Sequence, residues 1–167
     1  MMSATVMDAR LDFLVRVTQK ECTYLLETDG RLFAGLFTIE DARRIAIDHV
    51  LAERLDAFVS RFGRLQDTVG DKLLPAVLTA LAEKPGSAID NMDRAEKLGL
   101  LESVDTWMEM RKLRNQMVHE YIEDLAVLSS ALRSGHNFVP TLLATAQRFV
   151  AEIGRAQQRQ QRAKPAG

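Results

Sequence analysis

The amino-acid sequence predicts an all-α protein, an up-and-down four-helix bundle with one or two extra short helices. Apolar residues recur mostly three and four positions apart along several long stretches, which is the periodicity of an amphipathic helix. No stretch of the sequence alternates apolar and polar residues convincingly, as a half-buried strand would. Only four prolines interrupt the 167 residues, so the sequence is compatible with long helices.

The composition is typical of a soluble globular protein with one main domain, which we place at residues 1–154. Apolar residues make up 47% of the chain and charged residues 27%. The N-terminal stretch MMSATVMDAR lacks the basic and apolar segments of a secretory signal. No apolar run reaches the roughly 18 to 20 residues that a membrane-spanning helix needs. We therefore expect a cytoplasmic protein that makes no membrane contact.

Charge and cysteine content exclude several classes of function. The formal net charge of -1 is unlike the basic excess of proteins that coat nucleic acids, so any nucleic-acid contact must be local. The single cysteine, Cys22, excludes an intrachain disulfide, and with only three histidines no Cys/His zinc site is expected. We expect neither a metal nor another cofactor. Because Cys22 lies among apolar residues, we interpret it as a packed residue rather than a reactive thiol.

The first part of the chain predicts two helices separated by a turn. A first helix is expected over residues 8–26, and the turn residues within 29–35 end it. Thr38 followed three residues later by Asp41 predicts a capped helix start, because the threonine hydroxyl accepts from an early backbone amide. The second helix then runs from Ile39 to about Phe62.

The middle of the chain predicts a bend and a further helical stretch. Gly63 or the segment 66–70 is expected to bend the second helix. The next helical stretch, residues 65–82, contains Pro75. Because proline has no backbone N–H, we expect either a kink or a helix start just before it.

Capping residues delimit the helices that follow. Ser87 is expected to cap a short helix over residues 88–98, which Gly99 closes. Ser103 opens the next helix, which extends to about Tyr121 or on towards Leu128.

Glycine and proline also predict the end of the chain. The segment RSGHN at residues 133–137 is expected to break the helix, and Pro140 suits the first turn of a last one. Residues 155–167 contain almost no apolar side chain beyond alanine, so we expect a disordered basic tail there.

The stretch RNQMVHEY at residues 114–121 places an arginine where a helix would ordinarily keep an apolar residue. On a helical projection Arg114 falls inside a single apolar arc. That arc contains Trp107, Met110, Met117, Val118 and Tyr121. Because a guanidinium stays charged, it must find a partner or extend along its stem to solvent. An ion pair with Asp67 or Asp71 is one way to satisfy it.

A polar stripe accompanies this arc. Arg111, Asn115 and His119 follow one another at four-residue intervals, so they share one side of the helix. Arg114 and His119 are five residues apart, roughly 140 degrees around the helix, and do not contact each other in one chain. Two copies related by a two-fold axis could build a joint site. Such a site suits a phosphodiester, because histidine moves protons near neutral pH and arginine binds phosphate oxygens.

The order Arg114, Asn115, His119 and Tyr121 resembles the Arg-polar-x3-His-x-Tyr signature of the HEPN superfamily. More narrowly it resembles the HepT toxin branch, whose members are encoded beside minimal nucleotidyltransferases. Two blocks, Arg61–Leu78 and Ala95–Tyr121, look like the most recognisable parts of that branch. The resemblance implies a helical bundle that forms a homodimer, with the signature residues at the interface.

The resemblance also implies a chemistry and a means of control. The expected activity is metal-independent endoribonuclease cleavage of RNA, in which a 2'-hydroxyl attacks the adjacent phosphorus. His119 would transfer a proton and Arg114 would stabilise the phosphorane, with Asn115 and Arg111 in support. Tyr121 matches the tyrosine that the nucleotidyltransferase antitoxin adenylylates, which would silence the toxin by placing a bulky anion two residues from His119.

Two other interpretations stay open. Members with an intact signature can be non-catalytic, so the chain could instead be a nucleotide-binding or regulatory subunit of a minimal nucleotidyltransferase. A structural helical dimer, in which the signature only packs, is the third. The residues available to guide RNA are few, namely Arg111, Lys112, Arg133, Arg155, Arg159, Arg162 and Lys164.

Overall fold

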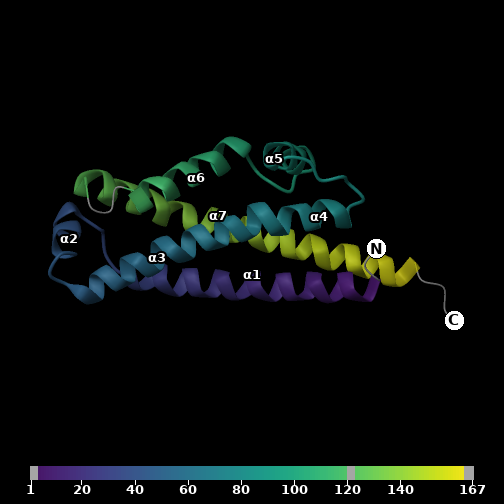
Figure 1. The fold of residues 1–167 in the computed structure, drawn as a ribbon, viewed down its shortest axis with the longest axis horizontal. Coiled ribbons are helices and arrows are strands. Elements are labelled where there is room, and N and C mark those ends of the chain that lie inside the picture. The colour runs from purple at the N-terminus through teal and green to yellow at the C-terminus, as the bar shows by residue number, and fades with distance from the viewer. Residues whose placement is uncertain (1–3, 120–122, 164–167) are drawn as a thin grey trace. The chain divides into compact units, whose positions relative to one another are not determined.

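The computed structural model describes residues 4–119 and 123–163, and within these ranges it contains helices and no strand. The predicted all-α helical bundle class is therefore confirmed. Figure 1 shows the elements. In chain order they are α1 (Ala4–Leu32), α2 (Ile39–Arg44), α3 (His49–Asp67), the π-helix η1 (Thr68–Leu73), α4 (Leu74–Ala80), α5 (Ala88–Lys97), α6 (Val104–His119) and α7 (Leu125–Ala163).

The helices form two compact units, each assembled from segments that are distant in the sequence. One unit contains residues 1–20, 67–104 and 144–167, and the other contains residues 21–66 and 105–143. The helices α1 and α7 contribute one part to each unit. The assignment of a single domain to residues 1–154 stays a prediction.

The unit of residues 21–66 and 105–143 holds the predicted site and has an aromatic and aliphatic core. Phe58 and Phe62 of α3 are fully buried, as are Met110 and Met117 of α6. Its four longer helical segments come from α1, α3, α6 and α7. Burying these large side chains removes apolar surface from water, which is the main stabilising contribution to such a bundle.

The first helix is longer than the sequence predicted. Helix α1 continues to Leu32, so residues 29–32 of the predicted turn are helical. Thr28 donates its hydroxyl to the carbonyl oxygen of Tyr24 at 2.8 Å and is itself buried. Asp29 is also buried and is hydrogen-bonded to His136 of α7. The prediction of a turn at Asp29 was wrong because a partner 107 residues away supports the last helical turn.

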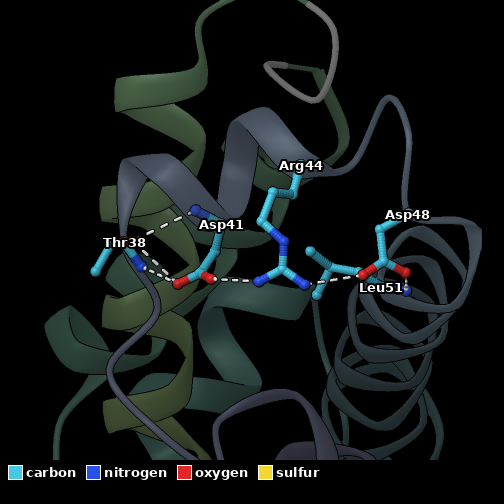
Figure 2. A network of polar contacts seen from close by, with 5 residues as sticks. All are labelled: Thr38, Asp41, Arg44, Asp48 and Leu51. Carbon is cyan, nitrogen blue, oxygen red and sulfur yellow. Dashed lines mark hydrogen bonds and ion pairs between the residues drawn. The ribbon is translucent and has the colours of Figure 1, made fainter.

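Figure 2 shows a chain of polar contacts that defines the starts of α2 and α3. The backbone N–H of Thr38 donates to Asp41 at 2.8 Å, and the N–H of Asp41 donates back to the Thr38 hydroxyl at 3.3 Å. This capping box confirms the predicted helix start. Arg44 then bridges Asp41 and Asp48, and Asp48 accepts from the N–H of Leu51 at 3.0 Å. The expected single helix from Ile39 is thus two helices.

The same contacts change the ionisation of Asp48. The hydrogen bond from the Leu51 amide, followed by that from Arg44, lowers the pKa of the Asp48 carboxyl below its ordinary value. Both donors favour the charged form of the carboxylate. The start of α3 is therefore stabilised by an ionised side chain.

The unit of residues 1–20, 67–104 and 144–167 contains the π-helix η1 and the helices α4 and α5. The sequence predicted a kink or helix start just before Pro75, and α4 begins at Leu74, with the proline in its first turn. Ser87 caps α5 as predicted, and together with Asp90 it forms a second capping box. Gly99 closes that helix with a φ of 71°, a conformation that glycine adopts at little cost.

The last helix differs most from the prediction. Helix α7 runs unbroken from Leu125 to Ala163 and includes Pro140 in its interior, so neither the break at residues 133–137 nor the helix start at Pro140 is observed. A Cβ added at Gly135 would lie 3.2 Å from the sulfur of Met117. The glycine in RSGHN thus allows α7 to approach α6 closely, rather than ending a helix.

The predicted basic tail is also helical as far as Ala163. Ile153 and Ala156 are buried, and Gln157 donates to Asp12 of α1 at 3.2 Å. Arg155 pairs with Glu152 at 2.5 Å. The expectation of disorder from residue 155 was wrong because these contacts support the helix. Among the described residues, no helix combines the length and the apolar character that crossing a membrane requires.

Candidate functional site

Helix α6 carries four of the five predicted site residues and presents two distinct sides. Trp107, Met110 and Met117 are buried, which confirms most of the predicted apolar arc. Val118 is 51% exposed, so its assignment to the buried arc was wrong. On a helical projection it lies at the margin of that arc, beyond the reach of the core.

Arg114 lies within the arc, between Met110 and Trp107 on a helical projection, and is half-buried. Its side chain runs along α3 at Gly63, which is itself buried. A Cβ added at Gly63 would lie 3.0 Å from Nε and 3.4 Å from Cγ of Arg114. The missing side chain of Gly63 therefore gives space to both the stem and the guanidinium. This placement lets a charged residue occupy an otherwise apolar helix position.

The predicted polar stripe faces away from the core. Asn115 and His119 are exposed and Arg111 is half-buried. His119 is the last residue of α6. Met108, 44% exposed, and Val118 share this outward side with Asn115 and His119. The outward side of α6 thus combines an imidazole, a carboxamide and two apolar side chains.

The remaining predicted residues fall in different places. Tyr121, the predicted modification site, lies outside the described residues. Lys112 and Arg133 are exposed. Arg155 and Arg159 are exposed but pair with Glu152. Lys164 also lies outside the described residues. Of the cations considered for guiding RNA, Arg111 and Lys112 are the two on the same helix as His119.

A pair of ionisable residues that the sequence did not predict lies between α1 and α7. Nδ1 of His136 is 2.7 Å from Oδ1 of Asp29. The His136 ring stacks on Phe33, with ring centroids 4.4 Å apart and planes at 25°. The Asp29 side chain is 11% exposed, whereas that of His136 is 41% exposed. The carboxylate therefore orients the imidazole while part of the ring remains in contact with solvent.

The sequence contained a weak signal for this pair. Asp29 and Phe33 are four residues apart and would share one side of a helix. The predicted turn within residues 29–35 placed Asp29 and Phe33 outside a helix. The predicted break at residues 133–137 likewise placed His136 outside one, so no contact between His136 and Asp29 was expected. The pair could have been expected only if both segments had been interpreted as helical.

Arg61 provides a second link between α1 and α3. It donates to the hydroxyl of Thr28 and, at 3.1 Å, to the carbonyl oxygen of Tyr24. Its guanidinium carbon lies 5.4 Å from the centroid of the Tyr24 ring, within the range of a cation–π contact. These contacts engage Arg61 in helix packing, so we assign it a structural role.

Metal and thiol chemistry have no candidate site in the described part of the chain. No group of three or more His, Cys, Asp or Glu side chains there could hold a metal ion. Burial, followed by the nearby charge of Glu21, raises the pKa of the Cys22 thiol to about 11. The thiol is therefore protonated at neutral pH and is a poor nucleophile.

Comparisons with known proteins identify no relative from which a function could be transferred. The chain matches no protein family, no curated protein and no solved structure. What the site can do must follow from its own chemistry: a half-buried arginine beside Gly63, and an exposed imidazole and carboxamide at the end of the same helix.

Proposed function

We propose that this chain is a homodimeric, metal-independent endoribonuclease, the toxin of a pair whose antitoxin is a minimal nucleotidyltransferase. The observation that carries the proposal is the arrangement of α6. Arg114 is held half-buried against Gly63, while Asn115 and His119 stand exposed four residues apart. A fixed guanidinium and an accessible imidazole are the groups that phosphodiester cleavage needs.

The proposed reaction divides between these two groups. His119 accepts the proton of the RNA 2'-hydroxyl as the 2'-oxygen forms a bond to the adjacent phosphorus. The bond from phosphorus to the 5'-oxygen breaks, that oxygen takes the proton that His119 accepted, and a 2',3'-cyclic phosphate remains. Arg114 offsets the charge that develops on the phosphoryl oxygens. Asn115 and Arg111 support the arginine and the phosphate.

A dimer is part of the proposal because one helix cannot bring Arg114 and His119 together. They are about 140 degrees apart around α6, so the arginine of one copy and the histidine of the other would share a substrate. The exposure of Met108 and Val118 on the outward side of α6 favours pairing through that side. Tyr121 would be adenylylated by the antitoxin, and both proteins would act in the cytoplasm.

The experiment is RNA cleavage by purified protein in the presence of a chelator. The wild-type chain should cut single-stranded RNA and leave termini with a 2',3'-cyclic phosphate. His119→Ala should abolish cleavage while retaining the circular dichroism and the molar mass of the wild-type dimer. Equal cleavage by this variant would reject the role of His119.

The same preparation addresses the alternative of a non-catalytic nucleotide-binding or regulatory subunit. If the wild-type chain does not cut RNA but binds a minimal nucleotidyltransferase stably, the ribonuclease proposal fails and the subunit is favoured. Mass spectrometry of Tyr121 after co-expression tests the silencing step. An unmodified tyrosine alongside an active nucleotidyltransferase would exclude it.

A further inference from the structure

Gly63 is a buried glycine inside α3 whose position nothing in helix formation explains. Glycine in a helix interior is less favourable than alanine by roughly 0.5 to 1 kcal/mol. Neighbouring α3 residues Phe62 and Leu65 are fully buried, so the site is in the packed part of the helix. The local sequence thus favours a larger residue, and the reason for glycine must lie in what approaches it.

What approaches Gly63 is the side chain of Arg114. The three atoms nearest to a Cβ placed on this glycine would be Nε at 3.0 Å, Cγ at 3.4 Å and Cζ at 3.6 Å, all from this arginine. Contacts this close to a methyl group require one partner to move. Because Nε is the atom in closest contact, the arginine side chain would have to give way by a few tenths of an ångström, and the guanidinium would be displaced with it.

Other helical glycines of the chain behave differently. A Cβ at Gly30 in α1 would meet no atom within 4 Å, so alanine fits there freely. A Cβ at Gly135 in α7 would meet Met117 at 3.2 Å and Phe58 at 3.5 Å, both apolar core residues. Gly30→Ala therefore controls for replacing a helical glycine by alanine, and Gly135→Ala controls for added volume in the packed core. In neither case is Arg114 among the atoms nearest to the added Cβ.

We propose that Gly63 is a positioning residue for Arg114: it keeps open the space in which the guanidinium lies and so fixes where that cation meets a phosphate. The inference rests on the proposed function for the identity of the anion, an RNA phosphodiester. Its structural part, the dependence of the Arg114 conformation on Gly63, is independent of any activity. Positioning matters because small displacements of a charged group weaken transition-state stabilisation strongly.

The test compares Gly63→Ala with Gly30→Ala and Gly135→Ala in the full-length protein. Gly63→Ala should reduce kcat/KM for single-stranded RNA by on the order of tenfold or more, while Gly30→Ala stays within about twofold of wild type. Gly135→Ala should lower the thermal midpoint, and the activity that remains in its folded fraction should match wild type. Wild-type activity in folded Gly63→Ala would overturn the proposal.

A double-mutant cycle shows whether Gly63 acts through Arg114. In an Arg114→Ala background, Gly63→Ala should cause no further loss of RNA binding or cleavage. An equal further loss would show that Gly63 acts by another route. If Gly63→Ala alone does not fold, the double variant should fold again, because the side chain that competes for the space has been removed. Failure of the double variant to fold would also overturn the proposal.

A spectroscopic measurement distinguishes this inference from the proposed ribonuclease activity. The Nε–Hε resonance of Arg114, assigned by its loss in Arg114→Ala, should move in Gly63→Ala and remain in place in Gly30→Ala. A moved resonance in a protein that never cuts RNA would uphold the positioning and reject the ribonuclease. An unmoved resonance would reject the positioning whatever the activity.

Discussion

The Nδ1 atom of His136 lies 2.7 Å from the carboxylate of Asp29, although 107 residues separate them in the chain. Asp29 is buried in the last part of α1, and His136 lies in α7 with its ring stacked on Phe33. A buried carboxylate is costly unless it is hydrogen-bonded. The pair therefore satisfies Asp29 and joins two helices of one unit.

Replacing the carboxylate should destabilise that unit. Asp29→Ala leaves the imidazole without its partner, and we expect the free energy of unfolding to fall by about 1 to 3 kcal/mol. Urea denaturation followed by circular dichroism measures the change. Asp12→Asn is the matched control, because Asp12 is an exposed aspartate of the same helix that accepts one hydrogen bond from Gln157. A similar loss in both variants would contradict a special role for Asp29.

The start of α2 should depend on the hydroxyl of Thr38. Thr38→Ala removes the oxygen that accepts from the N–H of Asp41, and caps of this kind contribute about 1 kcal/mol. Chemical denaturation should show a loss of that size, whereas Thr38→Ser, which retains the oxygen, should be close to wild type. If both variants lose equal stability, the methyl group of Thr38 rather than its hydroxyl matters.

The Cys22 thiol should make stability fall at high pH. Burial raises its pKa from 9.0 to about 11, so between these values the unfolded chain has lost the proton that the folded chain retains. The contribution is constant below pH 9 and decreases as the pH rises towards 11. Denaturation at pH 8 and pH 10.5 measures the decrease, and Cys22→Ala should show a smaller one. Iodoacetamide should also label the folded protein slowly at pH 8.

Glu152 should make the end of α7 sensitive to acid. The hydrogen bond from Arg155, together with the charges of Arg155 and Arg159, lowers the pKa of the Glu152 carboxyl. Its stabilisation is present above the ordinary value of 4.5 and is lost as the pH falls through the lower folded value. The protection factors of residues 157–163 in amide hydrogen exchange, which are corrected for the intrinsic pH dependence of exchange, should fall at acid pH in the wild type. Glu152→Gln should have low protection factors for these residues at every pH, and Glu102→Gln should resemble the wild type.

The outward side of α6 should hold the proposed dimer together. Val118→Lys places a cation on an exposed apolar position beside His119, and the like charges of two copies should oppose pairing. Sedimentation should then show a monomer that does not cut RNA. Leu26→Lys is the control, since Leu26 is 56% exposed on α1. A dimeric Val118→Lys variant would indicate that another surface forms the interface.

The sequence predicted those features that depend on neighbouring residues. The caps at Thr38 and Ser87 and the helix start before Pro75 follow from backbone hydrogen bonding within a few positions. The end of α1 and the continuity of α7 depend on contacts between distant segments, such as Asp29 with His136, and local patterns do not contain them. Packing between helices outweighed the low helix propensity of Gly30 in α1 and of Gly135 and Pro140 in α7.

In the candidate site, too, the sequence predicted what depends on neighbouring residues and not what depends on contacts between distant segments. The four-residue spacing on α6 predicted that Asn115 and His119 lie on one side, and the 3.6-residue period predicted the burial of Trp107. The sequence could not assign a role to Gly63, which was expected only as a possible bend. Its role becomes visible once α3 and α6 are in contact, because the neighbour that fills the space is 51 positions away.

The shared helices α1 and α7 have a practical consequence for any attempt to dissect this chain. Each compact unit is discontinuous in the sequence, so no single truncation releases one of them intact. Removing the first 20 residues or the last 20 would cut a helix and expose apolar faces that the remaining segments cover. Deletion fragments should therefore aggregate, and point substitutions in the full-length chain are the means of separating the contributions of its parts.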